Sequence, residues 1–241
     1  MTSVPAPAAT SGPERAEARY ALYYAPPTGS ALAAFGEAWL QTPQLDGFDP
    51  GLLRALTKSP RKYGFHGTLK PPFRLAAGCD VASLEAAVSD FTARRAPFSL
   101  GPLKVCLIDG FLALVPGNPS ESVAQLAADC VTHFDPFRRH ANRDEMARRR
   151  AAGLDAVEES YLQSWGYPYV LDRFRFHLTL TERLVGRVDA DRLPLLQKAI
   201  TERFAAACRE EPPLVADLCL FTQPTTNAPF TLAKRFSFSA T

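Results

Sequence analysis

The sequence predicts an α+β fold made of two related halves with mostly antiparallel sheets. First, strand-like and helix-like hydrophobic patterns alternate along 241 residues, 46% of them hydrophobic, which is enough to bury a core. Second, Asp109-Gly110 is the turn signal of an antiparallel hairpin. Third, residues 65–69 and 176–180 both read Phe-His-x-Thr-Leu, and self-similarity between distant segments is typical of related halves.

The individual elements follow from two periodicities. Strands are predicted where apolar residues lie between turn residues, and helices where they recur every three or four residues after a capping side chain such as Ser30, Asp80 or Ser120. In the first half of the chain this predicts strands over 19–25 and 64–73 and helices over 30–40, 52–56 and 80–95. In the second half it predicts a hairpin of 98–107 and 111–115, helices over 120–134 and 193–209, and strands over 170–181, 214–222 and 230–238.

Two regions differ in composition from the rest. Residues 1–18 are rich in Ala and Pro but lack the basic and apolar regions of a signal peptide, so we expect a disordered leader before a domain over 19–241. Segment 138–163 is polar, rich in arginine and predicted to be a helical insertion. It either covers the cleft, makes an oligomer contact or exposes a solvated face.

Charge and cysteine content narrow the class of protein. A net charge of +2 is by itself too weak to indicate a duplex nucleic-acid binder. Five cysteines, none in a C-x-x-C pair, indicate reduced thiols, and no apolar run approaches the roughly 20 residues that span a bilayer. We therefore expect a cytoplasmic protein without membrane contact.

The two repeated segments place polar side chains on one face of each predicted strand. Side chains alternate between the faces of a strand, so in the first segment His66, Thr68 and Lys70 share a face. In the second segment the corresponding face holds Arg173, Arg175, His177, Thr179 and Thr181. Matching His and Thr offsets in two distant strands are unusual for a buried or a merely solvated face. They indicate that both strands contact one shared oxyanion.

Phosphodiester chemistry needs the groups that these faces carry. A nucleophile loses a proton as it attacks phosphorus and a leaving oxygen gains one, and two histidines of pKa near ~6.5 can do both. The hydroxyls of Thr68 and Thr179 can donate hydrogen bonds to phosphoryl oxygens. Neither motif supplies further ligands at zinc spacing, so we expect no metal and no cofactor. The predicted catalytic residues are His66, Thr68, His177 and Thr179.

Other side chains near the motifs are candidates for substrate binding. Lys70 shares a strand face with His66, and Arg175 and Thr181 share one with His177. We therefore expect Lys70 and Arg175 to contact the phosphate and Thr181 to bind substrate beside them. Tyr23 and Tyr63 either stack on a base or sugar or belong to an amphipathic core.

At these residues the chain resembles the two-histidine phosphoesterase superfamily. Its signature, two H-x-[TS]-x motifs, is matched by residues 66–69 and 177–180. Further stretches at 19–23, 63–73, 165–169 and 173–181 are similar to an uncharacterised subfamily encoded among phosphonate-utilisation genes. The resemblance implies a bilobal fold with one motif from each lobe in a central cleft. It also implies action on cyclic phosphates or RNA ends, typically without metal.

Three functional hypotheses remain open from the sequence. The first is a hydrolase that opens a cyclic phosphodiester of a small sugar or nucleotide, in phosphonate metabolism according to the resemblance. The second is a module that binds a phosphate ligand or RNA end without turnover. The third is an RNA 2′,3′-cyclic phosphodiesterase or ligase, which needs a wide basic cleft. Neither the substrate nor the division of roles between His66 and His177 follows from the sequence.

Overall fold

The computed structural model describes residues 18–151, 153–208 and 212–240. Residues 1–17 of the predicted leader lie outside this part of the chain. In order, the elements are β1 (Arg19–Tyr24), α1 (Ala31–Gln41), α2 (Pro50–Leu56), α3 (Lys58–Arg61), β2 (Gly67–Phe73), α4 (Val81–Thr92), β3 (Phe98–Ser99), β4 (Leu103–Ile108), β5 (Phe111–Pro116), α5 (Glu121–His133), η1 (Asp135–Phe137), α6 (Arg143–Arg150), α7 (Ala156–Trp165), η2 (Leu171–Arg173), β6 (Leu178–Thr179), α8 (Leu193–Ala207), β7 (Leu214–Val215), β8 (Asp217–Gln223) and β9 (Thr231–Ser237).

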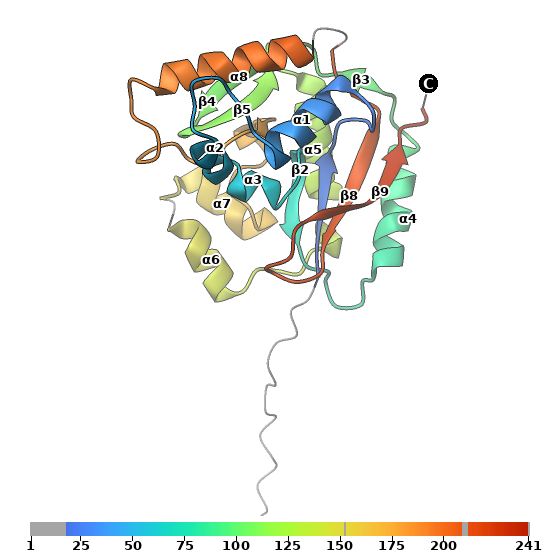
Figure 1. The fold of residues 1–241 in the computed structure, drawn as a ribbon. Helices are drawn as coiled ribbons and strands as arrows, with labels where there is room; N and C mark the ends of the chain where they lie inside the picture. The colour runs from blue at the N-terminus through green and yellow to red at the C-terminus, as the bar shows by residue number, and fades with distance from the viewer. Residues whose placement is uncertain (1–17, 152, 209–211, 241) are drawn as a thin grey trace, which may run out of the picture.

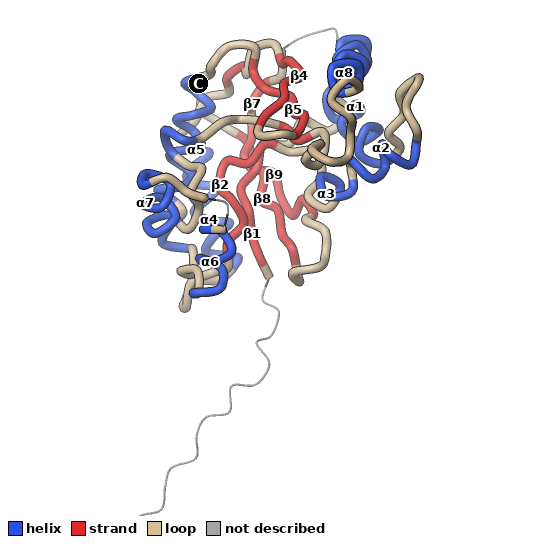
Figure 2. Tube along the Cα trace, turned by 90° about the vertical axis from the view of Figure 1, so that its left-hand side faces the viewer, coloured by secondary structure: helices blue, strands red, loops and turns tan. Residues whose placement is uncertain are grey.

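The strands form a seven-stranded sheet in the order β4-β5-β6-β2-β1-β8-β9, and every pairing between named strands of the described chain is antiparallel. Figure 2 shows α4, α5, α6 and α7 on one side of the strands and α1, α2, α3 and α8 on the other. Helix α5 packs against β2 and α4 against β8 and β9, whereas α8 packs against β4 (Figure 1). The two halves of the sheet are therefore covered by different helices, which confirms the predicted α+β class and its two halves.

The faces of β1 show why the sheet can carry both a core and a site. Leu22 and Tyr24 belong to the large apolar core that the helices complete. Ala21 and Tyr23 point the other way, into a small apolar cluster with Phe221 of β8. Because successive side chains alternate, one face is closed by helices while the other is left to line a pocket.

Several predicted elements are confirmed, and three need correction. Ser30, Asp80 and Ser120 cap α1, α4 and α5 through side-chain bonds to backbone N–H groups, as their position in the sequence predicts. Residues 98–107 do not form one strand, because β3 pairs with β7 in a separate sheet. The predicted helical segment 138–163 contains two helices, α6 and α7.

The strand predicted over 170–181 is mostly wrong. Its first residues form the 3₁₀ helix η2, where Leu171 has a positive φ of 55°, and only Leu178–Thr179 pair as β6. Alternating apolar residues mimic a strand in the sequence, yet here the chain approaches the sheet as irregular backbone. Trp39 of α1 stabilises the end of this segment, since its buried indole N–H donates to the carbonyl of Leu180 at 2.8 Å.

The first prediction concerns the contact between the two motif strands. Gly67 lies under the ring of Phe176, and a Cβ at this position would meet ring carbons at 2.5 and 2.6 Å. We expect Gly67→Ala to reduce the free energy of unfolding by about 1–3 kcal/mol, the usual cost of overpacking a close contact. Urea denaturation measures the change. An unaltered unfolding midpoint would contradict the close packing of β2 on the second motif.

Candidate active site

The first motif is held at the start of β2 by an aromatic support. The ring of His66 stacks on Tyr23 of β1, with ring centroids 3.9 Å apart and an interplanar angle of 24°. Tyr23 is itself buried against Phe221 and Phe230. Since Tyr23 pairs with Thr68 in the register of β1 and β2, both members of the first motif lie over this apolar cluster.

The second motif faces the first across the β2–β6 pairing. Gly67 lies opposite Leu178 in an antiparallel register. Continued by one residue in each direction, this register sets His66 opposite Thr179 and Thr68 opposite His177. Residues directly opposite each other project from the same face of a sheet, so all four side chains share one face. The arrangement is a local two-fold: each histidine has the threonine of the other motif beside it.

Both histidines make the same backbone hydrogen bond. Nδ1 of His66 lies 2.9 Å from the carbonyl oxygen of Gly64, and Nδ1 of His177 lies 2.7 Å from that of Arg175. A carbonyl oxygen only accepts, so each Nδ1 carries the proton and each neutral ring has its lone pair on Nε2. In the first motif this Nε2 accepts from the Thr68 hydroxyl at 3.3 Å. The geometry therefore makes Nε2 the proton-accepting atom of both rings.

The surroundings of the two rings differ in charge. Burial lowers the pKa of His66 to about 4, against a smaller opposing effect of the Gly64 carbonyl, and the neighbouring His177 lowers it further. Burial also lowers the pKa of His177, but the Arg175 carbonyl and the negative charge of Asp109 oppose that effect. His66 is therefore the ring more strongly held in its neutral form, and a carboxylate favours the protonated form only of His177.

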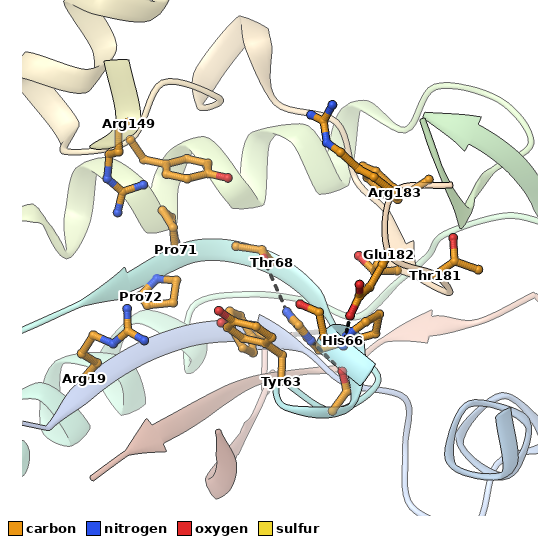
Figure 3. Close-up of a pocket in the computed structure, with 17 residues that line it drawn as sticks. Arg19, Tyr63, His66, Thr68, Pro71, Pro72, Arg149, Thr181, Glu182 and Arg183 are labelled. Carbon is orange, nitrogen blue, oxygen red and sulfur yellow. Dashed lines mark hydrogen bonds between the residues drawn. The ribbon is translucent and has the colours of Figure 1, made fainter. Parts of the chain in front are cut away.

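A cavity of about 420 Å³ opens beside these groups, a size suited to a small ligand. Thr68 and Thr179 from the two motifs line it together with His66, and the tyrosines predicted to bind substrate, Tyr23 and Tyr63, line it too. His177 is not itself a lining residue; its ring lies beside Phe111, 5.6 Å between centroids, which lines the cavity. Figure 3 shows His66 and Thr68 near the middle of the pocket.

Lys70 does not lie where strand alternation predicts. Its side chain is only 2% exposed and donates to the carbonyl oxygen of Val131 at 2.9 Å, with Asp135 3.8 Å away. The cause is a register shift: Tyr23 pairs with Thr68 but Leu22 pairs with Lys70, so β2 has one extra residue between them. Such a bulge turns the following side chain to the opposite face, here under α5. The predicted phosphate contact of Lys70 is therefore corrected to a structural one.

Two other predicted substrate-binding residues, Arg175 and Thr181, differ in their position relative to the cavity. Arg175 is exposed and does not line the cavity, and residues 174–177 before β6 do not belong to a strand. Thr181 does line it, but its hydroxyl oxygen already accepts from the backbone N–H of Leu112 at 2.9 Å, which anchors the end of the second motif.

Sequence reasoning missed several lining residues. Arg19 and Arg149 line one end of the pocket, and Glu182 and Arg183 line another part (Figure 3). Tyr167 also lines the pocket, with its ring 5.0 Å from the guanidinium of Arg149. The sequence could have indicated Arg19, because it lies two residues before Ala21 and four before Tyr23 and therefore shares a strand face with the predicted substrate-binding Tyr23. Arg149 had no such signal, since it comes from the polar segment whose placement depends on tertiary packing.

Two further properties of the described chain bear on the class of protein. Within the ranges that the structure describes, no three His, Cys, Asp or Glu side chains gather in a way that could hold a metal ion. In the same ranges, no helix has both the length and the apolar character needed to cross a bilayer.

Paired His-x-Thr segments on one face of an antiparallel sheet thus define an α+β protein with a two-fold histidine site. A family model described as "Protein of unknown function (DUF1045)" matches residues 68–231, and the chain belongs to this family.

Two curated relatives cover nearly all of this chain. The protein named ribose 1,5-bisphosphate phosphokinase PhnN of Janthinobacterium sp. (strain Marseille) is 38% identical over 92% of the chain and 51% of its own length. The protein of the same name from Laribacter hongkongensis (strain HLHK9) is 32% identical over 90% of the chain and 51% of its own length. The chain thus spans about half the length of the curated relatives it matches. Their gene name agrees with the predicted resemblance to proteins encoded among phosphonate-utilisation genes.

Solved structures with some likeness to the chain include LigT of E. coli and a phosphoesterase. LigT with NADP+ is 12% identical, covers 92% of this chain and 98% of LigT, and has a TM-score of 0.45. LigT with 3′-AMP is 14% identical at the same coverage, with a TM-score of 0.46. The phosphoesterase is 14% identical over 93% of this chain and 99% of its own, with a TM-score of 0.46.

The second prediction tests the structural role of Lys70. We expect Lys70→Ala to lower the free energy of unfolding by about 2–3 kcal/mol, because it leaves a cavity and an unpaired carbonyl of Val131. Lys104→Ala is the matched control, since that lysine also donates to a backbone carbonyl but is exposed. Urea denaturation gives both values. Folded Lys70→Ala protein should still bind inorganic phosphate like the wild type in a phosphorus NMR titration. A loss of that binding would show that Lys70 contacts the phosphate after all.

Proposed function

We propose that this protein is a phosphoesterase that hydrolyses a cyclic phosphodiester of a small sugar or nucleotide without a metal ion. The observation that supports this proposal most is the juxtaposition of two His-x-Thr segments through the Gly67–Leu178 register, with both Nδ1 atoms bonded to carbonyls. Two imidazoles that share one sheet face, each with its lone pair on Nε2, can serve one reacting phosphorus.

The reaction balances with these groups alone. A water oxygen attacks phosphorus as its proton passes to one Nε2, and the bond from phosphorus to one ring oxygen breaks. The other imidazolium gives its Nε2 proton to that departing oxygen, which leaves as a hydroxyl beside a phosphomonoester. Thr68 and Thr179 donate to the non-bridging oxygens, where charge accumulates in the transition state. Thr68 must release Nε2 of His66 to do so.

We assign the base to His66 and the acid to His177. A base must be neutral before the reaction, and burial holds the pKa of His66 near 4. An acid must be protonated, and the charge of Asp109 favours protonated His177. The local two-fold makes the two motifs alike in shape, and the different charges around them supply the asymmetry that acid–base chemistry requires.

The names of the relatives guide the choice of substrates. The curated proteins are named for ribose 1,5-bisphosphate, and LigT was crystallised with 3′-AMP and NADP+. Cyclic phosphates of ribose and of ribose 5-phosphate, nucleoside 2′,3′-cyclic phosphates and an oligoribonucleotide ending in a cyclic phosphate form a suitable panel. Turnover of the oligonucleotide alone would favour an RNA-end enzyme instead.

The third prediction tests the histidine pair. His66→Asn and His177→Asn should each lower kcat on the panel by about 10²- to 10⁴-fold, because each removes one proton-transfer step. Phosphorus NMR follows the conversion of cyclic diester to monoester, with and without a chelator, and circular dichroism checks the fold. If both variants keep wild-type turnover on every compound, the two-histidine mechanism is wrong. Ligand-induced shifts of the wild type without product would indicate a binding module, and activity lost to the chelator would indicate a metal.

The fourth prediction concerns pH. Because His66 is needed neutral, kcat/KM should fall as the pH drops through about 4. Because His177 is needed protonated, kcat/KM should also fall as the pH rises through a value below its ordinary 6.5. Asp109→Asn removes the charge that raises the pKa of His177, so the alkaline limb should move to lower pH while the acid limb stays. Asparagine tolerates the positive φ of 46° at this turn, which keeps the backbone unchanged. An alkaline limb that does not move would contradict the assignment of His177 as the acid.

A further inference from the structure

The pocket has a second cationic region away from the two motifs. Arg19 at the start of β1 and Arg149 of α6 both line it, and Figure 3 shows the two side chains at the same end, with Pro71 and Pro72 beside them. Burial lowers the pKa of Arg149, Tyr167 and Glu145 oppose that effect, and the nearby positive charges of Arg19 and Arg148 add to it. Two like charges are thus brought together, which costs free energy unless an anion joins them.

Within the ranges that the structure describes, neither arginine forms a salt bridge, and the carboxylate of Glu145, which acts on the charge of Arg149, is already paired with Arg74. Nε of Arg19 donates to the side-chain oxygen of Gln223 at 2.7 Å, and its guanidinium lies 5.5 Å from the ring of Phe230. The guanidinium of Arg149 lies 5.0 Å from the ring of Tyr167. By contrast, Arg150 on the same helix is paired with Glu159. Neutral partners orient the two pocket arginines and leave their charge and most of their donors available.

The position of this pair relative to the histidines follows from the strands. Arg19 lies opposite Gln223 and Tyr23 opposite Cys219 in one unbroken register, so Arg19 and Tyr23 share a face of β1. Their Cα atoms are about 13 Å apart, four residues at the usual rise, and Tyr23 carries the stacked His66. Long arginine side chains shorten that gap. Tyr63, stacked on Phe230, forms an apolar floor between the two regions.

We propose that Arg19 and Arg149 form a second anion subsite that binds a phosphomonoester, so that the substrate is a cyclic phosphodiester with a terminal phosphate at its other end. This inference rests on the proposed function and names its substrate class. Guanidinium groups suit a phosphate because their planar donors match its oxygens, often two at a time. The sugar then lies over Tyr23 and Tyr63, with the cyclic phosphate at the histidines.

The test compares substrates that differ only in the terminal phosphate. Ribose 1,2-cyclic phosphate is assayed with and without a 5-phosphate, and adenosine 2′,3′-cyclic phosphate with and without a 5′-phosphate. Arg19→Gln and Arg149→Gln should each lower kcat/KM for the phosphorylated member of the preferred pair by about 10- to 100-fold, the range for losing a bond to a charged group. The unphosphorylated member should change by less than about threefold. Arg148→Gln, an exposed neighbour that does not line the pocket, is the control.

Binding separates the subsite from the reaction. Ribose 5-phosphate is titrated by calorimetry into the wild type and both arginine variants, with thermal melts to check folding. Arginine-dependent binding without turnover of any cyclic phosphate would support the subsite and overturn the proposed function. Turnover with equal effects of the variants on both members of each pair, or with none, would overturn the subsite and leave the proposed function standing.

Discussion

Where β2 meets β6, Gly67 lies opposite Leu178, and the rest of the site depends on that one short contact. It joins the two halves of the sheet, and its register brings the two His-x-Thr segments onto one face. Only glycine fits at this position, because the ring of Phe176 occupies the space of a Cβ. A slip by one residue would turn either histidine to the other face, so the packing of Phe176 and Leu178 in the core fixes a polar arrangement outside it.

The polar centre is built on apolar supports, and this determines its protonation. Tyr23 stacks under His66 and is itself packed on Phe221 and Phe230, so the imidazole is desolvated while its Nδ1 proton is satisfied by a carbonyl. Burial of a neutral, hydrogen-bonded ring is inexpensive, whereas burial of its protonated form is not. The same apolar packing that gives β1 its second buried face therefore also holds one histidine in its neutral form.

The sequence predicts the regular parts of this molecule better than its irregular ones. Capped amphipathic helices such as α1, α4 and α5 follow from local signals, and the repeated motif identifies both histidines and both threonines. Strand alternation fails for Lys70 because one extra residue in β2 reverses its direction, and no local feature of the residues 67–73 announces that bulge. It fails for Arg175 because the chain before β6 begins with a 3₁₀ helix and joins the sheet only at Leu178. In both places, pairing with distant strands decides which way a side chain points.

Helix α6 is placed by polar contacts rather than by apolar packing. Few apolar contacts hold it, since none of its residues is buried. Its position comes from Glu145, which completes the capping box with Asn142 and also pairs with Arg74 just after β2. Arg149 lies one helical turn beyond Glu145 and therefore on the same face, directed by the end of the strand that carries the first motif. The sheet thus carries the paired His-x-Thr segments, while the ion pair of Arg74, just after β2, places the helix that, in our proposal, selects the substrate.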